Sequence, residues 1–353
     1  MNITRVSAGL LSAFALTVMS SMPAVAVAPL ATAARYSYDL GISPRLQWNS
    51  NYGYCGETSF ISAGMHFGQY TSQWTARSAA SPGVPQTEEE SQLLIGVNDI
   101  NAAEAMRLQA VAFDSESQQS TRQYLTWVKS MVLRGFPVII GVFTNMSEFD
   151  DSSDGESEYD HIVPVLGVGS QAPLSASNRT YRGTDVISFS DNALDGNTSA
   201  NSAVFRYRFN AFQKTRSQAN DPDSASYSLR NKPMNYATAV TGVMDPDGVT
   251  IPVRLTSNAD GEGVQDEDEM DAPPAARPIN LTATVSIPDQ NMGYTVYLYD
   301  DFTKVPIRNF NASAPSAIQS WSIAPGSGPS WSKTIGIMSN ETRVFRAVPN
   351  TAS

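Results

Sequence analysis

A single cysteine, Cys55, is the feature that most limits how this chain of 353 residues can fold. One thiol cannot form an internal disulfide, so the fold must be held by its hydrophobic core and its hydrogen bonds. Hydrophobic residues make up 41% of the chain, which is typical of a globular protein, and the length favours two domains. We therefore expect a core-stabilised protein whose one thiol is either buried and inert or used chemically.

The N-terminus has the pattern of a secretory signal peptide over residues 1–28. Arg5 gives a positive start, a short apolar segment follows at residues 10–18, and the small residues 26–28 resemble a cleavage site. No segment approaches the roughly 20 apolar residues that a membrane-spanning helix needs. We expect a secreted, extracellular protein without a membrane anchor, and a monomer.

The chain carries 34 acidic against 23 basic residues, a formal net charge of −11. Such a protein repels nucleic acid and anionic membranes, which excludes them as partners. Six Asn-X-Ser/Thr triplets are candidate glycosylation sites, and we expect these asparagines at the surface. They are Asn145, Asn178, Asn197, Asn280, Asn311 and Asn340.

The pattern of apolar residues predicts an α+β fold for residues 29–235. A helical pattern starts next to Cys55, and a second helix is predicted over residues 120–134. Apolar strands are predicted at residues 137–143, 161–168 and 185–190. We expect the helix that carries Cys55 to pack on an antiparallel sheet that carries His161.

From residue 236 the pattern changes to short alternating runs separated by Gly, Pro, Asn and Asp. This pattern predicts a second domain, an all-β sandwich over residues 236–353. Residues 258–278 are acidic and then rich in Ala and Pro, so we expect a flexible loop or linker there.

Cys55 lies where a thiol can serve as a nucleophile, because a helix N-terminus favours a thiolate. A catalytic thiol needs an imidazole within hydrogen-bonding distance, and the chain has only two histidines. His66 would lie about 16 Å from Cys55 along the same helix, which is too far. His161 is therefore the expected partner.

The sequence Tyr-Asp-His-Ile-Val-Pro-Val-Leu-Gly-Val-Gly at residues 159–169 resembles the histidine segment of papain-like cysteine peptidases. Cys55 followed by glycine at a helix start resembles the nucleophile of that family, and residues 135–140 resemble a strand of its bacteriocin-processing branch. The resemblance covers roughly residues 45–235 and implies a papain-like fold there. It also implies that Asp191, after the next strand, orients the histidine, with Asn192 as the alternative.

In the family, a glutamine six residues before the cysteine donates a hydrogen bond to the oxyanion. Here that position holds Asn49, and Gln47 lies two residues further upstream. Either carboxamide could act together with the backbone N–H of Cys55.

The acidic loop before His161 has two possible interpretations, a calcium-binding loop and a solvated loop. Asp150, Asp154 and Glu156 resemble the start of a calcium loop, but the twelfth position holds His161 where a bidentate Glu belongs. We therefore favour a solvated loop that raises the pKa of His161 and selects basic substrate side chains, and we expect no cofactor.

Together, these residues predict a secreted papain-like thiol hydrolase that cleaves peptide bonds in peptide or protein substrates through Cys55, His161 and Asp191. Two alternatives remain open. One is a non-catalytic secreted glycoprotein that uses the scaffold to bind protein or carbohydrate. The other is acyl transfer of the transglutaminase type, which uses the same Cys, His, Asp order.

Overall fold

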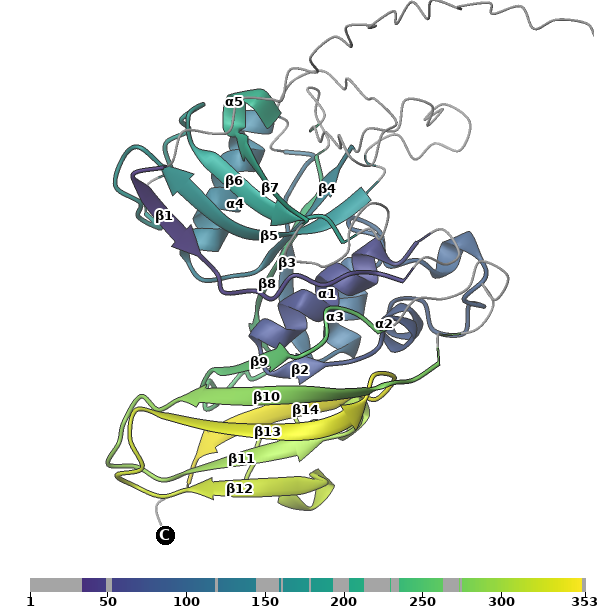
Figure 1. The fold of residues 1–353 in the computed structure, drawn as a ribbon, viewed down its shortest axis with the longest axis vertical. Helices are drawn as coiled ribbons and strands as arrows, with labels where there is room; N and C mark the ends of the chain where they lie inside the picture. The colour runs from purple at the N-terminus through teal and green to yellow at the C-terminus, as the bar shows by residue number, and fades with distance from the viewer. Residues whose placement is uncertain are drawn as a thin grey trace, which may run out of the picture.

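The structure is a computed structural model, and it describes residues 34–48, 53–117, 120–143, 159, 161–177, 179–192, 203–212, 229, 235–262, 273 and 275–350. The expected signal peptide at residues 1–28 lies outside these residues. The protein combines α-helices with several β-sheets (Figure 1). Every described pair of strands is antiparallel, so the predicted mixture of helix and antiparallel sheet is confirmed.

A seven-stranded sheet carries His161. Its strand order is β3-β8-β4-β5-β6-β7, and β1 also pairs with β5. The strands are β1 (Tyr36–Asp39), β3 (Leu108–Ala112), β4 (Val138–Val142), β5 (His161–Ser170), β6 (Val186–Ser190), β7 (Val204–Arg208) and β8 (Ala237–Val243). Both β4 and β5 are buried along their whole length, which explains their unbroken apolar sequences.

The sheet is covered by helices on both faces. The helices are α1 (Cys55–His66), α2 (Gln73–Ala80), α3 (Asp99–Ala105), α4 (Thr121–Leu133) and α5 (Phe209–Phe212). Side chains alternate between the faces of a strand, so Ile140 of β4 packs with α4 while its neighbour Ile139 packs with α1 and α3. The N-cap of α4 is Ser120, which forms a capping box with Gln123, so the helix predicted at 120–134 is confirmed.

Two further sheets contain most of the C-terminal strands (Figure 1). One has the order β13-β10-β9 and the other β12-β11-β14-β2. Their strands are β2 (Gln69–Tyr70), β9 (Val253–Ser257), β10 (Pro278–Ser286), β11 (Tyr294–Tyr299), β12 (Gln319–Ile323), β13 (Ser330–Met338) and β14 (Arg343–Pro349). In β10 every second residue is buried, which is the pattern of a strand with one face in a core.

The domain boundary expected at residue 236 is wrong by one strand. Strand β8 follows that boundary, yet it pairs with β3 and β4 in the sheet that carries His161. Conversely, β2 precedes the boundary by more than a hundred residues and pairs with β14. One hydrophobic core runs from α1 and α3 into both C-terminal sheets. The chain therefore changes sheets between β8 and β9, and the two parts share a core.

The segment expected to be a flexible linker, residues 258–278, is partly built into the structure. Residues 258–262 pack against the chain before Cys55, where the Leu46 N–H donates to the Asp260 carbonyl at 2.8 Å. Glu262 is only 4% exposed. The expectation of flexibility is wrong for these residues, while residues 263–272 and 274 lie outside the described part of the chain.

Candidate active site

Cys55 is the first residue of α1, at the turn formed by Gly53 and Tyr54. The first backbone N–H groups of a helix have no partner within the helix and create a positive field there, which favours a thiolate. The side chain of Cys55 is partly exposed, and it is a free thiol. Gly56 is required because a Cβ at this position would collide with the carbonyl oxygen of Leu93.

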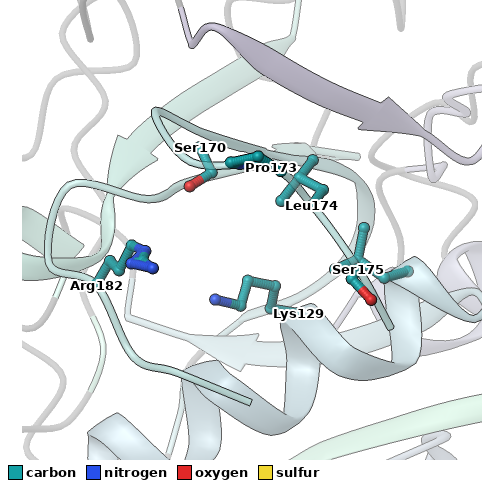
Figure 2. A pocket seen from close by; sticks show the side chains of 7 residues that line it. Lys129, Ser170, Pro173, Leu174, Ser175 and Arg182 are labelled. Carbon is teal, nitrogen blue, oxygen red and sulfur yellow. The ribbon is translucent and has the colours of Figure 1, made fainter. Parts of the chain in front are cut away.

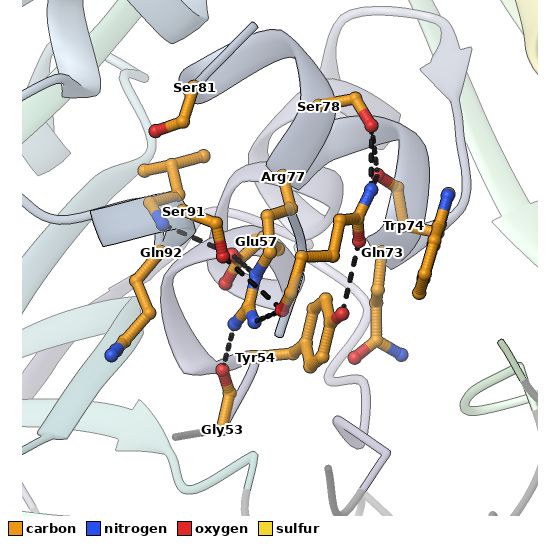
Figure 3. Close-up of polar contacts among 12 residues, drawn as sticks. Gly53, Tyr54, Glu57, Gln73, Trp74, Arg77, Ser78, Ser81, Ser91 and Gln92 are labelled. Carbon is orange, nitrogen blue, oxygen red and sulfur yellow. Dashed lines mark hydrogen bonds and ion pairs between the residues drawn. The ribbon is translucent and has the colours of Figure 1, made fainter. Parts of the chain in front are cut away.

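A buried ion pair fixes this turn (Figure 3). The Arg77 guanidinium, fully buried in α2, donates from Nε to Glu57 Oε1 at 2.7 Å and from Nη2 to the Gly53 carbonyl. It also lies over the Tyr54 ring, with Cζ 3.5 Å from the ring centre. Glu57 accepts a second hydrogen bond, from the Leu93 N–H at 3.1 Å. Arg77 thus holds both the residues before Cys55 and the first turn of α1.

Sequence reasoning missed this ion pair. The partner of Glu57 lies twenty positions further along the chain. The one available signal was a single carboxylate in a helix that has no other acidic residue, which calls for a cation where it is buried. Burial raises the pKa of Glu57, and the charge of Arg77 opposes this rise.

His161 and Asp191 form the second part of the site. His161 begins β5 and Asp191 follows the last residue of β6, and these strands are neighbours in the sheet. His161 Nε2 donates to Asp191 Oδ1 at 2.8 Å, and both side chains are buried. Since Nε2 is engaged by Asp191, Nδ1 is the ring nitrogen left to interact with the Cys55 thiol, which lies close enough to raise the pKa of the imidazole.

The charge state of His161 follows from these contacts. Burial lowers the pKa of the imidazole, but the charge and hydrogen bond of Asp191, together with those of Cys55, raise the pKa well above its ordinary value of 6.5. The imidazolium form is thus favoured at neutral pH. That is the form which stabilises a neighbouring thiolate.

Asn192, the alternative orienting residue, does not bond to the imidazole. Its Nδ2 donates to the Cys55 carbonyl at 3.0 Å, to Ser59 Oγ at 3.1 Å and to the Ile162 carbonyl at 3.1 Å. Asn192 therefore ties the first turn of α1 to β5, next to His161. Of the two candidates, Asp191 is the one placed to orient the ring.

Gln47 lies beside the nucleophile turn. Its Oε1 accepts from the Tyr54 N–H at 2.6 Å, and its own N–H donates to the Asn192 carbonyl at 2.7 Å. Within the described part of the chain, no group accepts a hydrogen bond from Gln47 Nε2. Asn49, the other candidate, lies outside the described residues.

His66 lies at the last residue of α1, at the opposite end from Cys55. Its Nε2 donates to the Gly135 carbonyl at 3.1 Å, and its Nδ1 contacts the Arg254 guanidinium. The histidine joins α1 to the end of α4 and to β9, as expected for a structural residue.

The calcium candidates Asp150, Asp154 and Glu156 lie outside the described residues. Among the residues described, no cluster of three or more His, Cys, Asp or Glu side chains could hold a metal ion. No described helix is both long and apolar enough to cross a membrane.

Three of the six glycosylation candidates, Asn145, Asn178 and Asn197, also lie outside the described residues. Asn280 and Asn340 are exposed, as expected. Asn311 is different, because its Nδ2 donates to the Pro349 carbonyl and its Oδ1 accepts from Tyr297. Asn311 is thus partly exposed, but both ends of its side-chain amide are already hydrogen-bonded.

Two hollows lie away from Cys55. One, of about 770 Å³, is bordered by β1, the end of α4 and residues 173–176. The other lies beside it and is lined by Lys129, Ser170 and Arg182, among others (Figure 2). Lys129 is bound to Asp185 Oδ2 at 2.8 Å, so its charge is already paired. Neither Cys55 nor His161 borders these hollows.

In comparisons with known proteins, no family model, no curated protein and no solved structure matches the chain. The function proposed below therefore rests on the geometry of the site.

Proposed function

We propose that this protein is a papain-like thiol hydrolase that cleaves peptide bonds through Cys55, His161 and Asp191. The observation that carries the proposal is the pairing of the His161 ring with Asp191 at 2.8 Å, with the Cys55 thiol at the start of α1 close enough to raise the pKa of the imidazole. These are the three roles that thiol acyl transfer needs: a nucleophile, a general acid and base, and a group that orients it.

In the proposed reaction, the Cys55 thiolate attacks the carbonyl carbon of a peptide bond. The oxyanion that forms accepts hydrogen bonds from the Cys55 N–H and from Gln47 Nε2. His161 then protonates the leaving amine, which departs and leaves an acyl thioester on Cys55. The neutral imidazole next takes a proton from water, and the resulting hydroxide releases the acid and regenerates the thiolate.

The finer description of the fold belongs to the same proposal. A helix that carries the nucleophile, followed along the chain by strands that carry His161 and Asp191, is the order of the papain-like fold. The sheets β13-β10-β9 and β12-β11-β14-β2 share one core, and we infer that they form a β-sandwich extended by β2.

We further propose that the protein is secreted and acts on peptides with basic side chains. The signal-like residues 1–28 support secretion, and the formal net charge of −11 favours cationic substrates. Exposed Asn280 and Asn340 are the described positions best placed to carry glycans.

Labelling of the thiol tests this function. We expect iodoacetamide or E-64 to modify Cys55 at neutral pH, as measured by mass spectrometry, and to abolish hydrolysis of a fluorogenic peptide that contains Arg. Cys55→Ala should lower kcat by at least about 10⁴-fold, since it removes the nucleophile, and Cys55→Ser serves as the near-isosteric control for folding.

Hydrolysis that persists in Cys55→Ala, or a Cys55 that does not react while the protein is folded, would reject the proposal. Lack of both reactivity and hydrolysis would favour the non-catalytic alternative. Incorporation of a primary amine without hydrolysis would instead indicate transglutaminase-type transfer.

A further inference from the structure

The chain before Cys55 is held in place by residues that follow β9. The Leu46 N–H donates to the Asp260 carbonyl at 2.8 Å, and Arg45 Nη1 donates to the Ala259 carbonyl at 3.2 Å. A Cβ at Gly261 would lie only 2.9 Å from the Leu46 carbonyl oxygen, so the two segments are in close backbone contact. In Figure 1 the green chain that leaves β9 runs up towards α2.

Glu262 extends this contact through a side chain. Its Oε1 accepts from the Gln73 N–H, at the start of α2, at 2.5 Å. Gln73 Oε1 in turn accepts from the Trp48 N–H at 3.1 Å. All three residues are buried, with exposed fractions of 4% for Glu262, 2% for Gln73 and 0% for Trp48. A buried chain of hydrogen bonds therefore connects Glu262 to Trp48, the residue after Gln47.

Gln47 is enclosed by these contacts. Its neighbour Leu46 is bound to Asp260 and its neighbour Trp48 to Gln73. The Trp48 ring also packs on Tyr54, with the ring centres 4.4 Å apart. Displacement of either neighbour would therefore move the carboxamide of Gln47 relative to Cys55.

Glu262 is itself anchored in the C-terminal sheets. Arg277, just before β10, donates from Nη2 to the Gly261 carbonyl at 2.5 Å. Ser339, in the turn between β13 and β14, donates from Oγ to the Glu262 carbonyl at 3.4 Å and accepts from the Arg277 N–H at 3.1 Å. The position of Glu262 is thus set by strands outside the sheet that carries His161.

We propose that Glu262 is a positioning residue for the oxyanion side of the site, acting through Gln73 and Trp48 to fix Gln47. The inference rests on the proposed function and deepens it: the C-terminal sheets supply part of the machinery that stabilises the transition state. Cys55 and His161 have anchors of their own, through Arg77 and Asp191, so loss of Glu262 should act mainly on the oxyanion donor.

The test compares kcat, KM and the rate of Cys55 alkylation in Glu262→Ala and Glu262→Gln. Glu262→Ala should lower kcat about tenfold or more, because small displacements of a transition-state donor cost about that much or more. KM and the alkylation rate should stay within about twofold. Glu262→Gln keeps an acceptor oxygen for the Gln73 N–H and should retain most of kcat. Asp300→Ala, at an exposed ion pair with Lys304, is the control for loss of a carboxylate.

Two results would overturn the proposal: a kcat within twofold of the wild type in Glu262→Ala, or equal losses of kcat and alkylation rate, which would indicate a general disruption. If Glu262→Ala does not fold, Gln73→Ala takes its place, because it breaks only the link to Trp48. Gln73→Ala must then lower kcat while KM and the alkylation rate stay within about twofold. An unchanged kcat in Gln73→Ala would again reject the proposal. Cys55→Ala, measured in parallel, separates the two hypotheses, since full hydrolysis in that variant rejects the proposed function itself.

Discussion

Two buried carboxyl groups, Glu57 and Glu262, hold the two sides of the candidate site. They differ in whether a cation contacts the carboxyl group. Glu57 contacts the Arg77 guanidinium directly at 2.7 Å. Among the residues described, Glu262 has no cation in contact, and its oxygen accepts from a backbone N–H. Burial raises the pKa of Glu262 to about 8, although the charge of Arg45, the hydrogen bonds of Gln73 and the charge of Arg277 oppose the rise.

Because of this difference, the two sides of one site should respond differently to pH. The nucleophile side is fixed by an ion pair, whose geometry needs both charges. The oxyanion side is fixed by a carboxyl group that is neutral below about pH 8 and becomes a buried anion without a cation in direct contact above it. Substitutions at Arg77, Glu262 and Ser339 test these two roles.

Removal of Arg77 should have the largest effect. Arg77→Leu leaves Glu57 buried without its cation, and we expect the free energy of unfolding to fall by about 3–5 kcal/mol. Urea denaturation followed by circular dichroism measures this change. The double variant Glu57→Leu/Arg77→Leu should recover much of the loss, because no unpaired charge remains. A loss below about 1 kcal/mol in the single variant would contradict the role given to the pair.

Glu262→Gln should have a smaller effect, and one that depends on pH. The folded pKa of about 8 lies above the ordinary 4.5, so the carboxyl group favours folding fully below pH 4.5 and this contribution is lost as the pH rises through 8. The variant cannot ionise, so it should equal the wild type near pH 4, and its advantage should then grow by up to about 1.4 kcal/mol for each pH unit between pH 4.5 and 8. Unfolding curves recorded across this pH range measure the difference in stability between the variant and the wild type. A difference that does not change with pH would contradict the prediction. Asp300→Asn is the surface control.

Ser339→Ala should have the smallest effect. It removes the hydroxyl that bonds to the Arg277 N–H and the Glu262 carbonyl, at a cost of about 1 kcal/mol. Because Glu262 then loses part of its anchor, kcat should fall slightly, by about twofold, without a change in the alkylation rate of Cys55. A fall in the alkylation rate would show that the two sides of the site are not independent.

The parts of the fold that follow from local sequence could be predicted. The helix after Ser120 and the buried strands around His161 have patterns that depend only on neighbouring residues. The pairing of His161 with Asp191 was predicted from the resemblance to papain-like peptidases, and the structure brings the two side chains together.

The rest depends on partners that are distant in the sequence. The residues of β8 have the same alternating pattern as the strands that follow, and nothing in them indicates pairing with β3 and β4. Glu262 stands at the start of an acidic, Pro-rich stretch, where a solvated carboxylate is the ordinary expectation. Its burial follows only from its contact with Gln73, which lies 189 positions away.

The pairing of β2 with β14 has a consequence for the order in which the protein can be completed. Strand β2 closely follows α1, but its partner is made late in synthesis: the adjoining contact between Thr71 and Thr342 joins residues 271 positions apart. Closing so long a loop is slow, and the surface that β14 will cover stays open until then. The surroundings of α1 are thus completed only once β14 has been synthesised, since the adjoining contact spans 271 positions of the chain.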